Sequence, residues 1–105
     1  MGTPIWIAFD FGIKGDYEGM YSWLDDHNAK ECGNNIAFLN YEIEKDKYII
    51  DNLKEDLSGS IVISKRDRIY VIWLRDNQME GQLLFGKRKA SPWTGYGSKE
   101  TEKDF

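Results

Sequence analysis

Residues 4–11 have the sequence PIWIAFDF, in which Ile5 and Ile7 alternate with a second apolar series that begins at Trp6. Alternation of β-branched and aromatic residues at a period of two predicts a β-strand. Both faces of this strand are mostly apolar, and the same holds for RIYVIWL at residues 68–74. Strands of this kind are typical of a sheet that is covered on both faces. The two segments are therefore predicted to belong to a sheet with a cover on each face.

Two amphipathic helices are predicted to pack against this sheet. Residues 16–29 begin with Asp16, a good N-cap residue, and their apolar positions then recur at helical spacing. Residues 46–58 show the same helical spacing of apolar positions, and Gly59 follows in the position where a helix often ends. Each helix has one apolar side, so the pair is expected to cover one face of the sheet.

Three further strands are predicted from short apolar runs: NIAFLNYEI at residues 35–43, SIVIS at 60–64 and QLLFG at 82–86. The resulting order predicts an α+β fold, a two-layer sandwich of about five mostly antiparallel strands with two helices, ferredoxin-like or related. A chain of 105 residues has room for one core. Residues 1–97 are therefore expected to form a single domain, and the polar residues 98–105 a flexible tail.

The first part of the chain carries a resemblance in pattern. The strand that ends at Asp10, the helix that follows it and the strand at residues 35–43 resemble the start of small ferredoxin-like CRISPR-adaptation nucleases, a family whose members also dimerise. The resemblance extends to about Ile43. Beyond that residue the expected order departs from the family, in which a second hairpin strand comes before the second helix.

Basic and aromatic residues gather near the C-terminal end, in FGKRKASPWTGYG at residues 85–97. The chain has 14 basic and 18 acidic residues and a net charge of −4, and without the three cations of this segment the remaining 11 basic residues leave −7. Lys and Arg bind phosphate oxygens, and aromatic rings stack on bases. We therefore expect a nucleotide-like or phosphate-bearing ligand, whereas three cations give too short a footprint for duplex nucleic acid. The predicted ligand-binding residues are Lys87, Arg88, Lys89, Trp93 and Tyr96.

The second apolar face of the sheet needs a cover, because two short helices cover only one face. The sequence offers three: the C-terminal segment, a subunit partner, or curling of the sheet. In the first case Trp93 and Tyr96 would fold back over the sheet and would not bind a ligand. An open aromatic face would be a large exposed apolar patch. A homodimer or another protein partner is therefore also expected.

A magnesium site is the alternative interpretation of the acidic residues near the first strand. Asp10, Asp16 and Glu18 offer hard oxygen ligands that could hold Mg²⁺ for phosphodiester hydrolysis. Solvation of Asp10 and capping by Asp16 explain the same residues more simply. The favoured expectation is therefore no metal, no cofactor and no catalytic residue.

The compartment is inferred from cysteine usage and from apolar runs. Cys32 is the single cysteine, the chain opens without a secretory pattern, and no run approaches the roughly 20 apolar residues of a membrane span. We therefore expect a small cytoplasmic, non-catalytic binding or regulatory module without membrane contact. The alternatives are a Mg²⁺-dependent phosphodiesterase or nuclease, and a homodimeric protein-interaction factor such as an inhibitor of another enzyme.

Overall fold

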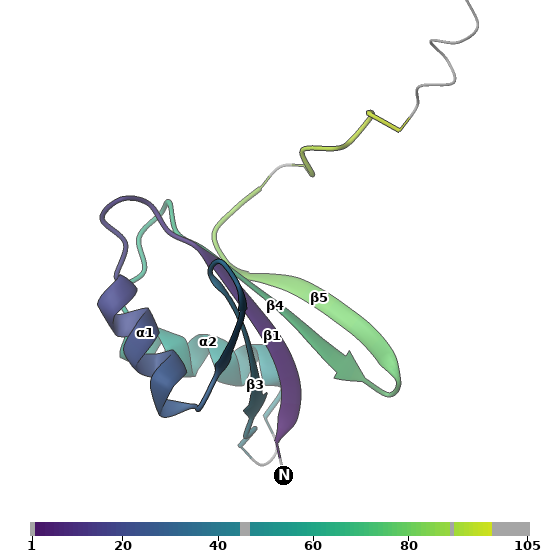
Figure 1. The fold of residues 1–105 in the computed structure, drawn as a ribbon. Helices are drawn as coiled ribbons and strands as arrows, with labels where there is room; N and C mark the ends of the chain where they lie inside the picture. The colour runs from purple at the N-terminus through teal and green to yellow at the C-terminus, as the bar shows by residue number, and fades with distance from the viewer. Residues whose placement is uncertain (1, 45–46, 89, 98–105) are drawn as a thin grey trace, which may run out of the picture.

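The fold is a five-stranded antiparallel sheet with two helices, which confirms the predicted α+β class. The computed structural model describes residues 2–44, 47–88 and 90–97. Figure 1 shows both helices on one face of the sheet. The elements in chain order are β1 (Thr3–Asp10), α1 (Tyr17–Asp26), β2 (Lys30–Gly33), β3 (Ile36–Tyr41), α2 (Ile49–Ser60), β4 (Arg68–Arg75) and β5 (Gln78–Phe85).

Strand β1 lies in the middle of the sheet. The strand order is β2-β3-β1-β4-β5, and every neighbouring pair is antiparallel. Ile5 of β1 lies opposite Leu39 of β3 on one side and Trp73 of β4 on the other. These residues point toward the helices, and all three are buried. The side chains of β1, β3 and β4 that face α1 and α2 thus form the core together with the helices. The main core residues are Ile5, Ile7, Phe9, Met20, Trp23, Leu39, Leu53, Leu57, Ile69, Val71 and Trp73.

Several predicted boundaries and one predicted strand are wrong. Strand β5 begins at Gln78, four residues before the expected residue 82. Helix α1 stops at Asp26, before the expected residue 29, because Asn28 takes a left-handed conformation with φ 56° and reverses the chain. Helix α2 runs from Ile49 to Ser60, so Gly59 lies inside its last turn and not beyond its end. The segment SIVIS at residues 60–64 forms no strand.

The edge strand β2, Lys30–Gly33, was not predicted from the sequence. Strand β2 pairs with β3 in a hairpin, and the hairpin comes before α2. The expected departure from the order strand, helix, hairpin, helix is therefore not present. The strand was missed because its side chains carry no apolar alternation, and its first three residues are exposed.

The second face of the sheet remains open. Trp6, Ile72 and Leu74 point away from the helices and are 45%, 45% and 44% exposed, although they lie on the inner strands β1 and β4. The C-terminal segment does not cover them: it leads away from the sheet in Figure 1, and Trp93 and Tyr96 are 72% and 70% exposed. The expectation that these two aromatic residues form a lid over the sheet is therefore wrong.

The start of α1 is fixed by Asp16, which is the N-cap, as predicted. Its Oδ1 accepts a hydrogen bond from the Gly19 N–H at 2.9 Å, and its Oδ2 accepts one from the Val62 N–H at 2.9 Å. The bond from Val62, followed by that from Gly19, lowers the pKa of Asp16 below its ordinary value of 3.8. The ionised Asp16 carboxylate therefore contributes its full stabilisation at pH values above the ordinary pKa of 3.8. This contribution is lost as the pH falls through the lower pKa of the folded state.

We expect alanine at the two helical glycines to have opposite effects on stability. A Cβ at Gly19 would overlap the Asp16 carboxylate and displace it from both N–H groups, whereas a Cβ at Gly59 would meet nothing within 4 Å. Gly59→Ala should raise the free energy of unfolding by about 0.5 kcal/mol through helix propensity. Gly19→Ala should lower it despite the same gain in propensity. Urea denaturation measures both, and two variants that are equally stabilised would show that the Asp16 cap contributes nothing.

Candidate functional site

Four cationic side chains converge on one hollow at the end of the sheet. The hollow has a volume of about 820 Å³. Asp10 lies directly opposite Arg68 in the β1–β4 register, and Phe85 lies opposite Ile69, the next residue of β4. The end of β1, the start of β4 and the end of β5 therefore meet at the same edge. We call this site the basic hollow, and its charged lining residues are Asp10, Lys65, Arg66, Arg68 and Lys87.

Asp67 connects the two loops that line the basic hollow. Its side chain is only 1% exposed. One carboxylate oxygen accepts a hydrogen bond from the Gly12 N–H at 3.3 Å, and the other accepts one from the Ser64 N–H at 2.8 Å. This buried carboxylate ties the backbone of the β1–α1 loop to that of the α2–β4 loop.

Gly86 allows the end of β5 to approach the same loop. Its φ is +98°, and a Cβ there would lie 2.7 Å from both the Arg68 Cγ and the Asp67 carbonyl oxygen. Glycine has no Cβ and adopts positive φ without strain. The chain can therefore turn tightly at this point, which brings Lys87 to the rim of the basic hollow.

The charges in the basic hollow are not balanced. Asp10 is the one acidic side chain among the lining residues, and its Oδ2 lies 3.6 Å from the Arg68 Nη1. Within the part of the chain that the structure describes, no acidic residue pairs with Lys65, Arg66 or Lys87. The hollow therefore offers an excess of positive charge to an anionic group.

The structure brings only part of the predicted ligand-binding set to this place. Lys87 lines the basic hollow, and Arg88 follows it as an exposed residue outside the lining. Lys89 lies outside the described residues. Trp93 and Tyr96 lie further along, in turns closed by hydrogen bonds such as that from the Tyr96 N–H to the Trp93 carbonyl oxygen.

Lys65 and Arg66 of the α2–β4 loop and Arg68 at the start of β4 were not predicted as site residues. The sequence pattern indicated that KRD, residues 65–67, is a short polar break between two hairpin strands and that Arg68 begins the second of them. The density of charge in the run of residues 65–68 was the available signal, because three cations around a single Asp67 exceed what a turn requires. The distance of about twenty residues between this run and Lys87 hid their proximity.

The three carboxylates of the magnesium alternative have separate roles. Asp16 accepts two backbone hydrogen bonds, Asp10 pairs with Arg68, and Glu18 is exposed in the first turn of α1. Residues 2–44, 47–88 and 90–97 contain no group of three or more His, Cys, Asp or Glu side chains that could hold a metal ion.

A buried polar contact joins β3 to α2 on another side of the molecule. The Tyr41 hydroxyl donates to the Asp56 Oδ2 at 2.9 Å, and the His27 Nε2 lies 3.7 Å from the same oxygen. Burial and, next, the bond to Asp56 raise the pKa of Tyr41 well above its ordinary value. The hydroxyl therefore stays protonated at neutral pH, and it serves as a hydrogen-bond donor and not as a nucleophile.

Comparisons of this chain with protein-family models, with curated proteins and with solved structures find no match. Among the described residues, no helix has the length and apolar character needed to cross a membrane. The geometry of the basic hollow is therefore the basis on which a function is argued.

Proposed function

We propose that this protein is a small non-catalytic binding or regulatory module that holds a phosphate-bearing, nucleotide-like ligand in the basic hollow. One observation carries the proposal: cations from the α2–β4 loop, from β4 and from the end of β5 converge, and only one carboxylate lies among them. Lys and Arg bind phosphate oxygens by charge-assisted hydrogen bonds. The fixed loops around Asp67 would reduce the cost of ordering these side chains.

The size of the hollow favours a small ligand over a nucleic-acid duplex. Ligand sites usually measure about 300–1,000 Å³, and the basic hollow measures about 820 Å³. A duplex needs an extended row of cations, because its affinity comes from many phosphate contacts. The four cations lie around one hollow, on a chain whose net charge is −4.

The aromatic residues of the C-terminal segment would complete the site. Trp93 lies six residues after Lys87, a length of chain that spans up to about 20 Å when extended. Its ring is 72% exposed and therefore accessible for stacking. We propose that a ligand bound to the cations draws this segment over the hollow, so that Trp93 stacks on its planar part.

Titration with ATP, with inorganic phosphate and with a short single-stranded oligonucleotide tests the proposal. Arg66→Ala and Arg88→Ala are each expected to weaken ATP binding, by about tenfold for Arg66, and to reduce its salt dependence, since each removes a cation that salt screens. Trp93→Ala should weaken binding and leave the salt dependence largely unchanged. Lys54→Ala, on α2, is the matched control and should change neither.

Two results would contradict the proposal. If none of the three probes binds at low salt, or if Arg66→Ala and Lys54→Ala behave alike, the cations are solubilising charges only. Retained phosphate binding with no effect of Trp93→Ala would limit the site to an anion-binding hollow.

A homodimeric interaction factor is the second candidate, and the open sheet face favours it. Trp6 and Ile72 are cross-strand partners at the middle of this face, and each is 45% exposed. A partner subunit is the proposed cover for the apolar side chains that the helices and the C-terminal segment leave exposed. The basic hollow begins at one end of this same face, where Asp10 lies opposite Arg68, so the proposed dimer contact and the proposed ligand site adjoin.

We also propose a ferredoxin-like topology, with β5 as an added edge strand. The first six elements follow the order β-α-β-β-α-β, and their strands are arranged β2-β3-β1-β4. A cytoplasmic location is proposed on the state of Cys32, an exposed free thiol of the kind that a reducing compartment maintains.

A further inference from the structure

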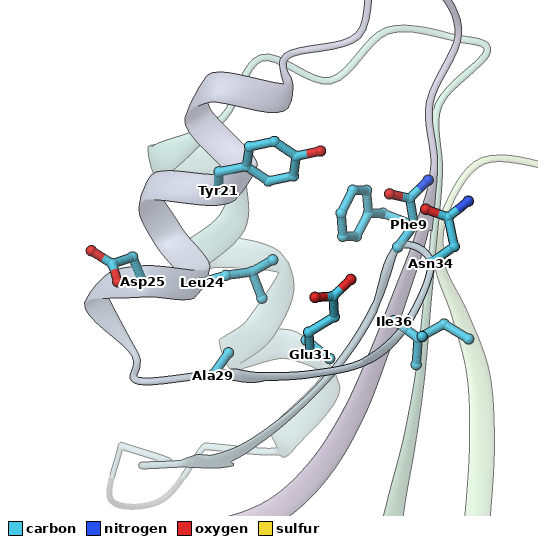
Figure 2. Close-up of a pocket in the computed structure, with 11 residues that line it drawn as sticks. Phe9, Tyr21, Leu24, Asp25, Ala29, Glu31, Asn34 and Ile36 are labelled. Atoms are coloured by element: carbon cyan, nitrogen blue, oxygen red, sulfur yellow. The ribbon is translucent and has the colours of Figure 1, made fainter.

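A second hollow lies between α1 and the β2–β3 hairpin, and its lining differs in character from that of the basic hollow. Its volume is about 360 Å³ (Figure 2). Tyr21 and Leu24 form its helical wall, and Phe9 contributes apolar surface from the sheet side, whereas the Ile36 side chain points away from the hollow. We call it the acidic hollow, because the charged side chains that line it are Asp25 and Glu31, and its described lining includes no Lys or Arg.

The two carboxylates of the acidic hollow are placed differently. Figure 2 shows the Glu31 carboxylate directed into the space between the helix and the hairpin, toward Tyr21 and Phe9. Asp25 lies at the outer end of the helix and points away from this space. One negative charge therefore faces the interior of the hollow.

Aromatic rings stand beside that charge. The Phe9 and Tyr21 ring centroids are 6.2 Å apart at an interplanar angle of 69°, so the two rings form a corner. The faces of aromatic rings attract cations, and the attraction is stronger where water is partly excluded. The Glu31 carboxylate, the two aromatic rings and the Leu24 side chain together match a ligand that is cationic at one end and apolar in its body.

The walls of the acidic hollow are held by backbone hydrogen bonds. The Phe9 N–H donates to the Asn35 carbonyl oxygen at 3.0 Å, which fastens the hairpin turn to β1. The Ala29 N–H donates to the Leu24 carbonyl oxygen at 3.0 Å and fixes the end of α1. The hollow is thus formed before a ligand arrives, which reduces the ordering cost of binding.

We propose that the acidic hollow binds a small organic ammonium ligand, with its cationic group at the Glu31 carboxylate and its apolar body against Phe9, Tyr21 and Leu24. A bare divalent metal ion does not fit, because Mg²⁺ and Ca²⁺ need about six oxygen ligands and one carboxylate faces the space. A phosphate-bearing ligand does not fit either, because Glu31 and Asp25 would repel it. The site is independent of the proposed function of the basic hollow.

Titration with butylammonium, followed by the backbone amide NMR signals of Gly33 and Asn34, tests this proposal. We expect saturable shifts with butylammonium, and none with 1-pentanol or pentanoate, which are similar in size but neutral and anionic. Glu31→Gln should weaken butylammonium binding about tenfold, because it removes the charged acceptor and keeps the shape. Asp25→Asn is the matched control and should change the affinity by less than about twofold.

Three outcomes overturn the proposal. Equal shifts with 1-pentanol would make the hollow a non-selective apolar groove. Equal weakening by Asp25→Asn and Glu31→Gln would show general attraction to an acidic surface. The absence of saturable shifts with butylammonium in a folded protein would show that no amine site exists there. Because Glu31 is exposed on an edge strand, Glu31→Gln is expected to fold.

Discussion

Replacing Asp67 with alanine is expected to lower the free energy of unfolding by about 3 kcal/mol, because two backbone N–H groups then lose a charged acceptor in a buried site. The donors, Gly12 and Ser64, lie on different loops, so the variant also loses the link between these loops. Urea denaturation of the wild type and the variant, with an unchanged m value, gives the difference directly.

Two further variants separate the charge of Asp67 from its shape. Asp67→Asn keeps one acceptor oxygen and should lose about half as much stability as Asp67→Ala. Asp26→Asn, at the exposed end of α1, is the control and should stay within about 0.5 kcal/mol of the wild type. A loss below about 1 kcal/mol for Asp67→Ala would mean that water replaces the carboxylate, and that the loops around the basic hollow are held by other contacts.

The fold class could be predicted from local sequence patterns, but the assignment of SIVIS as a strand was wrong. In SIVIS, Ile61 is buried and Val62 is 75% exposed, so the alternation that predicted a strand is real. The segment nevertheless crosses from α2 to β4 without a sheet partner, and the Val62 N–H bonds to Asp16. Alternation of apolar and exposed residues thus indicates an extended chain with one buried side. Whether such a segment pairs with a strand depends on the rest of the fold. Strand β2 is the converse case, since it pairs through its backbone and its side chains show no such pattern.

The candidate site was predictable only in its C-terminal part. Lys87 stood out because it belongs to a dense basic run. Arg66 and Arg68 line the same hollow as Lys87, but they are far from it in the sequence. Their proximity follows from the antiparallel register, which places Asp10 opposite Arg68 at the edge where β5 ends. Register depends on long-range packing, which single-sequence patterns do not contain. The role of Gly19 was likewise hidden, because the group that requires its small size is the Asp16 carboxylate, held in turn by Val62.

The open face has the size of a functional patch. Four strands at about 4.8 Å spacing and about five residues at 3.3 Å give a projected area of roughly 300 Å². The largest apolar patches on monomers reach about 300–600 Å² and often mark interaction sites. Its inner positions carry the uncharged residues Trp6, Ala8, Tyr70 and Ile72, and the charged pair Asp10 and Arg68 lies at one end of the same face. The partner that we propose is a second copy of the chain, which would bury these apolar residues against the same residues of its own face.

Ile72→Lys is therefore expected to convert a dimer into a monomer. Sedimentation equilibrium of the wild type should give a mass near twice the 12.3 kDa of the chain at micromolar concentration. Ile72 lies opposite Trp6 at the middle of the open face, so a lysine there would place an unpaired charge in the interface. Burial of such a charge costs several kcal/mol, and we expect the dissociation constant to rise at least about a hundredfold.

Val62→Lys is the control for this prediction, because Val62 is 75% exposed and lies outside the sheet. It adds the same charge to the chain and should leave the dimer intact. Since Ile72 is 45% exposed in the single chain, Ile72→Lys should have little effect on the folding of the monomer, so a change in mass would report on association alone. A wild-type protein that sediments as a monomer at tens of micromolar, or an equal response to the two lysine variants, would contradict dimerisation through this face.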